Sequence, residues 1–175
     1  MHKVIKASIK SLEKSIKLLS LLSDDNLSDS KVSPYYSSVG SHIRHILDFY
    51  SCIIYGYQEN YIDLTDRKRD QRIENNCDFA LVYTQKIIFE LKAIHDLNKK
   101  VIVNDDLGLG DIKIEYSIAS LLAQANSHTI HHYALINYIL DGLGIKFEDD
   151  DFGFNETTSF YEDAKNYDTE TGEDK

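Results

Sequence analysis

The strongest constraint on the fold is a helical period in the apolar residues near the start of the chain. Isoleucines and leucines recur there at alternating steps of four and three, with lysines between them: Ile5, Ile9, Leu12, Ile16 and Leu19. That spacing places one apolar stripe along an amphipathic helix over residues 2–23. The 175 residues of the chain are enough for one domain with a sizeable core and too few for two ordinary domains. We therefore expect this helix to pack against others around a single core.

Three further segments carry helical signals. They cover residues 38–57, 75–97 and 117–141, to within a few residues at each end. A serine hydroxyl can cap the free N–H groups of the second helix at Ser37 or Ser38, and Ser117 can cap the fourth. Gly142 and Gly144 follow the fourth helix, as is typical of a helix end. The sequence thus predicts an all-α fold, a four-helix bundle.

The connections between these helices differ in character. Residues 58–74 are polar and densely charged, and a connection of that length lets the third helix run parallel to the second. Residues 101–103 and 112–116 are apolar or alternate in polarity around a glycine-bearing turn, which predicts a short β-hairpin between helices three and four. We expect residues 1–147 to form the bundle and residues 148–175 an acidic, partly disordered extension, whose first part docks through its aromatic residues.

The net charge of −10 is concentrated in that extension. From Glu148 onward eleven acidic residues stand against two lysines, which leaves the rest of the chain near neutral. Binding to a phosphate backbone needs a basic face, so nucleic acid is not an expected partner. The longest apolar candidate, Tyr133 to Leu140, is too short to cross a membrane, and the first residues lack the apolar core of a secretory signal. A cytoplasmic location is the expectation.

Five of the seven histidines fall in two short clusters on predicted helices: His42 and His45, then His128, His131 and His132. Histidines four apart project from one face of a helix, about 40° apart around its axis. His128 and His132 can therefore grip one metal ion, and a third imidazole from a facing helix would leave a coordination position open, as in catalytic sites. The two cysteines, Cys52 and Cys77, form no metal-binding pair and are expected to be reduced core thiols.

The histidine motifs resemble those of the DinB-like (DinB/YfiT) superfamily of metal-dependent enzymes. The matching stretches are Ser38-Val39-Gly40-Ser41-His42-Ile43-Arg44-His45-Ile46-Leu47-Asp48 and Asn126-Ser127-His128-Thr129-Ile130-His131-His132-Tyr133-Ala134. The resemblance implies an up-down-down-up four-helix bundle with a metal site near one end of the core. Carried over by position, the metal ligands are His45, His128 and His132. Members of this family include thiol-dependent transferases and isomerases, so the resemblance identifies the site better than the reaction.

Spacing alone leaves alternatives open for the ligands and their neighbours. His42 could replace His45 and His131 could replace His132, although we favour accessory or exposed roles for both. Gln124 and Asp48 are each one turn from a ligand and are candidates to orient it, while exposure to solvent is an equal alternative for Asp48. The glutamate of a metalloprotease His-Glu-x-x-His motif is absent, which argues against a protease-type general base. No catalytic residue is assigned.

The expected function is that of a metal-dependent hydrolase or thiol transferase, in which a divalent ion activates water or a low-molecular-weight thiol. The alternative is a non-catalytic module that binds a metal or small ligand, and a pocket at the open coordination position would distinguish the two. Zinc is the first expectation for the ion, with nickel, iron or manganese as alternatives. The expected partners are a small-molecule substrate and a second copy of the chain in a homodimer. The basic run Arg67-Lys68-Arg69 with Arg72 could bind an anionic substrate group, although such runs more often lie in solvated loops.

Overall fold

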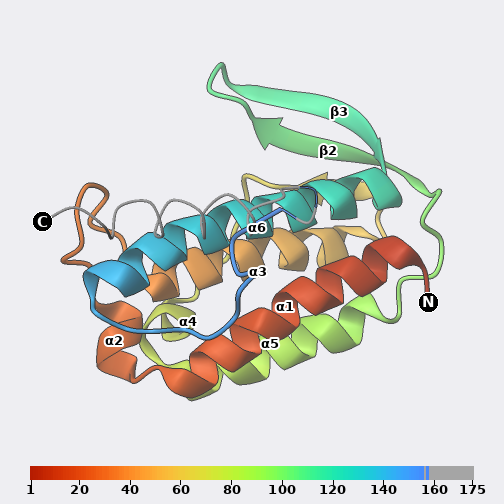
Figure 1. Cartoon of the computed structure of the whole chain (residues 1–175). Helices are drawn as coiled ribbons and strands as arrows, with labels where there is room; N and C mark the ends of the chain where they lie inside the picture. The colour runs from red at the N-terminus through yellow and green to blue at the C-terminus, as the bar shows by residue number, and fades with distance from the viewer. Residues whose placement is uncertain (156, 158–175) are drawn as a thin grey trace, which may run out of the picture.

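Six helices and a three-stranded sheet account for most of the described part of the chain, residues 1–155 and 157, in the computed structural model. The elements in chain order are α1 (Lys3–Leu21), α2 (Asp24–Ser28), α3 (Val39–Gly56), β1 (Tyr61–Asp63), α4 (Gln71–Asn75), α5 (Cys77–Leu91), β2 (Lys100–Asp106), β3 (Asp111–Ser117) and α6 (Ile118–Gly142) (Figure 1). Within these residues no helix has the length and apolar character needed to cross a membrane. Residues 156 and 158–175, which belong to the acidic extension predicted to be partly disordered, lie outside the described part.

The long helices begin where the sequence supplies capping side chains. The Ser38 hydroxyl accepts the Ser41 N–H at 3.0 Å at the start of α3, and Ser117 exchanges hydrogen bonds with Ser120 at the start of α6. The third predicted helix ends earlier than expected, at Leu91 rather than near residue 97. Its apolar period continues into a turn in which the Asp96 carboxylate accepts the N–H groups of Asn98 and Lys99. An apolar period can therefore outlast the helix that it predicts.

The four long helices pack side by side. α1 contacts α5 and α6, and α3 contacts the same two helices. The Cys77 N–H, at the start of α5, donates to Asp24 just beyond the end of α1, and Gly40, at the start of α3, lies against the backbone of Glu74, just before α5. α6 ends against the loop between α2 and α3. Thus α1 and α6 end, and α3 and α5 begin, at the same end of the molecule (Figure 1).

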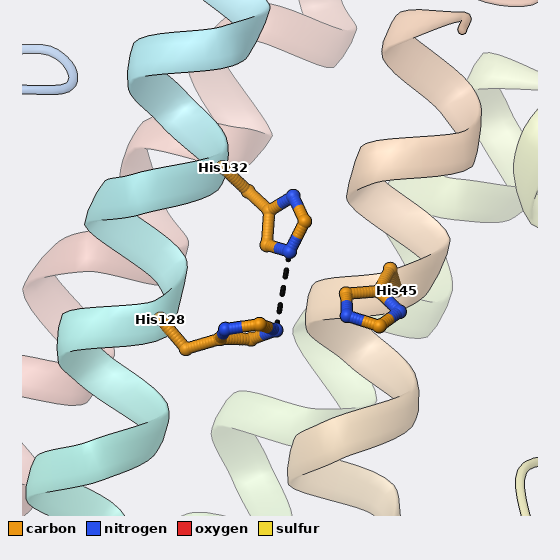
Figure 2. Close-up of side chains that lie close together, drawn as sticks. All are labelled: His45, His128 and His132. Atoms are coloured by element: carbon orange, nitrogen blue, oxygen red, sulfur yellow. Dashed lines mark hydrogen bonds between the residues drawn. The ribbon is translucent and has the colours of Figure 1, made fainter. Parts of the chain in front are cut away.

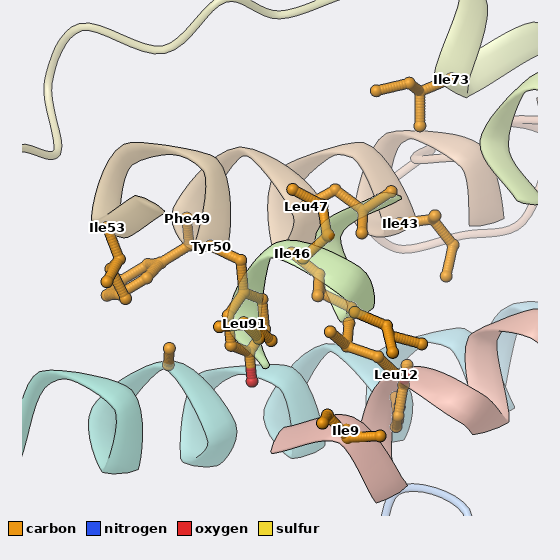
Figure 3. Packing of buried hydrophobic residues seen from close by; sticks show 14 of the residues in the cluster. Ile9, Leu12, Ile43, Ile46, Leu47, Phe49, Tyr50, Ile53, Ile73 and Leu91 are labelled. Atoms are coloured by element: carbon orange, nitrogen blue, oxygen red, sulfur yellow. The ribbon is translucent and has the colours of Figure 1, made fainter. Parts of the chain in front are cut away.

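One apolar core lies between these helices (Figure 3). Fully buried members from α1, α3 and α5 meet there and include Leu12, Ile43, Ile46, Leu47, Ile53 and Leu91. The segment after α6 adds to this core, because the Phe152 ring is 1% exposed and stacks on Tyr133 with 4.3 Å between ring centroids. The Tyr133 hydroxyl in turn donates to the Ser11 carbonyl at 2.6 Å. The first part of the acidic extension therefore docks on the helices, as its aromatic residues predicted.

The sheet contains the predicted hairpin and one strand that was not predicted. β2 and β3 are antiparallel and project beyond α6 (Figure 1). β1 lies parallel to β2, with Tyr61 opposite Ile102, although residues 58–74 were expected to be a plain connection. Three residues are too few to show a strand period in the sequence. Just after β1, the Leu64 N–H donates to the Asn104 carbonyl at 2.9 Å, so this pairing fixes the loop that leads to α4.

Candidate metal centre

Three histidines from two helices meet where α3 faces α6. His45 lies on α3, and His128 and His132 lie one turn apart on α6; all three rings point toward one another (Figure 2). Each offers one ligand nitrogen such that the three atoms lie within 4.8 Å of one another. The Nε2 atoms of His128 and His132 are 3.1 Å apart. The structure therefore brings together the three residues predicted as ligands, in a group that could hold a metal ion.

Burial keeps these imidazoles neutral. His132 is buried, while His45 and His128 are half-buried. Burial lowers the pKa of His45 to about 4, with a smaller contribution from the charge of Arg67. Burial also lowers the pKa of His132 to about 2, and electrostatic repulsion between protonated His132 and protonated His128 adds to this effect. The pKa of His128 is also lowered, first by burial. At neutral pH each ring therefore has one unprotonated nitrogen, which a metal ligand requires.

His42 supports His132 from the side away from the other two ligands. Its Nδ1 lies 2.8 Å from the Nδ1 of His132, and its Nε2 lies 2.9 Å from the Ser37 hydroxyl. If His132 gives its Nε2 lone pair to an ion, its Nδ1 must carry the proton and donate to His42. His42 then carries its own proton on Nε2 and donates to Ser37. This chain of hydrogen bonds is compatible with the tautomer of His132 that can bind a metal through Nε2, and would stabilise it.

His131 is exposed, and its ring centroid lies 5.3 Å from that of His132. The structure thus separates the two histidines that spacing left open, since His42 is hydrogen-bonded to a candidate ligand and His131 faces solvent.

The two other polar candidates have different surroundings. Asp48 is buried, so the alternative of solvent exposure is wrong for it, and its carboxylate accepts from Arg44 at 2.6 Å. Burial raises the pKa of this carboxyl, against the lowering effect of the Arg44 charge. The Gln124 Oε1 is buried without a hydrogen-bond partner among the described residues. Neither group makes a hydrogen bond to a candidate ligand in the described part of the chain, so the structure gives no support for their predicted orienting role.

Only one member of the basic run reaches the histidines. Arg67, in the loop after β1, places its Nη1 2.9 Å from the Nδ1 of His45. Lys68 lies over the ring of Tyr55 instead, and Arg72 pairs with Asp70. These three side chains of the run therefore lie in three different environments, which the sequence did not indicate.

Sequence reasoning missed two neighbours of His128. The Phe49 ring, from α3, lies 5.4 Å from the His128 ring, and the Asp105 carboxylate of β2 acts on His128 in the direction that raises its pKa. Phe49 lies one turn after His45, and helical spacing could have indicated it. Asp105 comes from the hairpin, and no local pattern in the sequence relates that position to α6.

Comparison with known proteins leaves the chain without an assigned family. No family model, curated protein or solved structure matches it. The DinB-like resemblance therefore depends on the histidine motifs alone.

Two cavities lie beside neighbours of the candidate ligands. The first has a volume of about 540 Å³ and lies beside His42; its lining includes Val32, Pro34, Tyr35, Leu135 and Tyr138. The second has a volume of about 460 Å³ and lies on the side of the loop after β1; its lining includes Asp48, Cys52, Tyr55, Asp63 and Lys68. The three candidate ligands line neither of these two cavities, although each cavity approaches one of their neighbours.

Proposed function

We propose that the chain is a metal-dependent enzyme of the DinB-like superfamily that holds a divalent ion between His45, His128 and His132. The observation that carries this proposal is the convergence of three neutral imidazoles, with ligand atoms within 4.8 Å, from two helices. The hydrogen bond between His42 and His132 supports it, because metal-ligating histidines are commonly oriented by such a partner. Three nitrogen ligands favour zinc, with nickel, iron or manganese as alternatives.

The same proposal includes the finer architecture, an up-down-down-up four-helix bundle built from α1, α3, α5 and α6. The pairwise contacts of these helices support it. So do the directions of the helices, because α1 and α6 end at the end of the molecule where α3 and α5 begin. In such a bundle, side chains on facing helices can build a metal site in the core. The contact between α3 and α6 provides those facing helices here.

An ion bound by these residues would supply Lewis acidity, which makes a water molecule or a thiol a stronger acid and a nucleophile near neutral pH. The chain places threonine and isoleucine between His128 and His131, and the Thr129 hydroxyl is buried and donates to the Ala125 carbonyl. No protease-type glutamate is thus available at that position to act as a general base. We therefore favour transfer from a low-molecular-weight thiol over hydrolysis of a peptide.

The thiol in this proposal comes from outside the chain. Burial raises the pKa of both cysteine thiols, Cys52 and Cys77, to about 11. Both are therefore protonated at neutral pH, and the protonated thiol is a poor nucleophile. Cys77 in addition donates its S–H to the Leu22 carbonyl at 3.4 Å.

Metal analysis of protein purified without an affinity tag tests the site. We expect about one divalent ion per chain, bound in competition with a chelator of known affinity. Cobalt-substituted protein then tests the open coordination position by titration with cellular thiols and with azide, read from its visible absorption bands. Absence of stoichiometric metal would contradict the proposal. If the metal binds but no added ligand changes the spectrum of the cobalt-substituted protein, the non-catalytic binding module is favoured over the enzyme.

A further inference from the structure

One cation beside the candidate ligands makes no direct ion pair in the described part of the chain, although its charge acts on the nearby Asp48 carboxyl. Arg67 is half-buried; its Nη1 lies 2.9 Å from Nδ1 and 3.4 Å from Nε2 of His45, and its Nε donates to the Leu64 carbonyl at 2.7 Å. Arg44 directly precedes His45 on α3 and differs from Arg67, since it forms ion pairs with both Asp48 and Glu74. A half-buried guanidinium whose hydrogen-bond partners are a carbonyl and an imidazole can still take up an anion.

A metal ion cannot bind His45 while Arg67 is hydrogen-bonded to the same ring. A neutral imidazole has one protonated nitrogen and one lone pair. Arg67 has only donors, so it occupies that lone pair, and a metal ion requires the same lone pair whichever nitrogen coordinates it. Binding of an ion to His45 would therefore release the Nη1 of Arg67 beside the ion.

We propose that Arg67, once released, binds the carboxylate of an anionic small-molecule substrate; this inference rests on the proposed metal-dependent function. Because its Nε is held by Leu64, the guanidinium presents its Nη1 and Nη2 groups as a pair of donors, which matches the two oxygens of a carboxylate. The loop that carries Arg67 is fixed by the pairing of β1 with β2, so the guanidinium is positioned before the substrate arrives.

The positive charges around the site favour the same ligand, whereas the carboxylates of Asp48 and Asp105 act against it. The three histidines are neutral, so a divalent ion keeps its full charge and adds to the charge of Arg67. Lys68 and Arg72 are already occupied, by the Tyr55 ring and by Asp70 respectively. An acid whose carboxylate reaches Arg67 and whose reactive group reaches the ion would thus meet two positive charges in a partly desolvated site.

The first test is metal affinity without substrate. In Arg67→Gln the competing guanidinium and its charge are gone, so zinc should bind about tenfold more tightly than in the wild type. The matched control is Arg72→Gln, which removes an exposed arginine from the same basic run and should leave zinc affinity unchanged. A chromophoric chelator in competition gives both values. Equal or weaker zinc binding by Arg67→Gln would overturn the mutual exclusion.

The second test is the binding of two probes to zinc-loaded protein, measured by calorimetry. Wild-type protein and Arg72→Gln should bind 3-mercaptopropionate at least about tenfold more tightly than 3-mercaptopropan-1-ol, which lacks the carboxylate. Arg67→Gln should lose this preference while its affinity for the alcohol is unchanged. Arg67→Lys keeps the charge but not the pair of donors, so its preference for the acid should be smaller than that of the wild type. This variant replaces Arg67→Gln in the test if the glutamine variant does not fold.

The outcomes separate the two proposals. If wild-type protein binds no metal, the proposed function fails and the anion site fails with it. If metal binds but neither probe does, or if Arg67→Gln retains the preference for the acid, the anion site alone is refuted.

Discussion

Replacement of His42 by alanine should weaken metal binding although His42 is not itself a candidate ligand. The Nδ1–H of His132 would lose its acceptor at 2.8 Å, and the ring its preferred tautomer. Loss of such an outer partner costs about 10–100-fold in metal affinity. The cavity of about 540 Å³ beside His42 would let water reach the exposed N–H, which limits the penalty. We therefore expect the lower part of that range, about 10–30-fold, or about 1.4–2 kcal/mol.

The assay is competition for zinc with a chromophoric chelator at pH 7.5, with thermal melting of the metal-free variants to confirm that they fold. His42→Asn offers an amide oxygen close to the position of Nδ1 and should recover most of the affinity. His131→Ala removes an exposed imidazole and is the matched control. If His42→Ala binds zinc as tightly as the wild type, or if His131→Ala loses as much affinity, the proposed tautomer chain is wrong.

Three further outcomes are expected. His128→Ala should lose stoichiometric metal, measured by elemental analysis, and retention of one ion per chain would remove His128 from the ligand set. The free energy of unfolding of the metal-free protein should be constant above about pH 6.5 and fall below it. Burial lowers the pKa of folded His45 to about 4 and of His132 to about 2, so below about pH 6.5 the unfolded state binds more protons than the folded state. A free energy that urea titrations find constant between about pH 8 and 5 would contradict this. Phe152→Ala should cost about 3–5 kcal/mol of stability in urea, whereas Phe89→Ala, at a side chain that is 75% exposed, should cost far less; equal losses would show that Phe152 does not contribute to the core.

Local patterns in the sequence were sufficient to predict the four long helices, but not the short helices α2 and α4. Apolar spacing and capping serines predicted α1, α3 and α6 to within a few residues, because a helix is specified by neighbours three and four positions apart. The end of α5 was wrong since its apolar period continues through the turn at Asp96. β1 was missed because its strand conformation depends on pairing with β2, which is distant in the sequence. Elements that depend on remote partners have no local period to reveal them.

The candidate site shows the same division. The pairing of His128 with His132 follows from helical spacing, and their meeting with His45 was expected from the family resemblance. The distinct roles of His42 and His131 depend on the rotation of α3 and α6 about their axes, which spacing does not give. The position of Arg67 depends on β1, and it could not have been placed without that strand.

The hydrogen bond between His42 and His132 joins residues 90 positions apart, and this separation has a consequence for the order of folding. The groups around the ion assemble only when the last long helix docks on α3, after the intervening chain has closed a long loop. Before docking, an ion could bind only the local pair of imidazoles on α6. A bound metal would therefore act on the completed molecule, slowing its unfolding more than it hastens its folding.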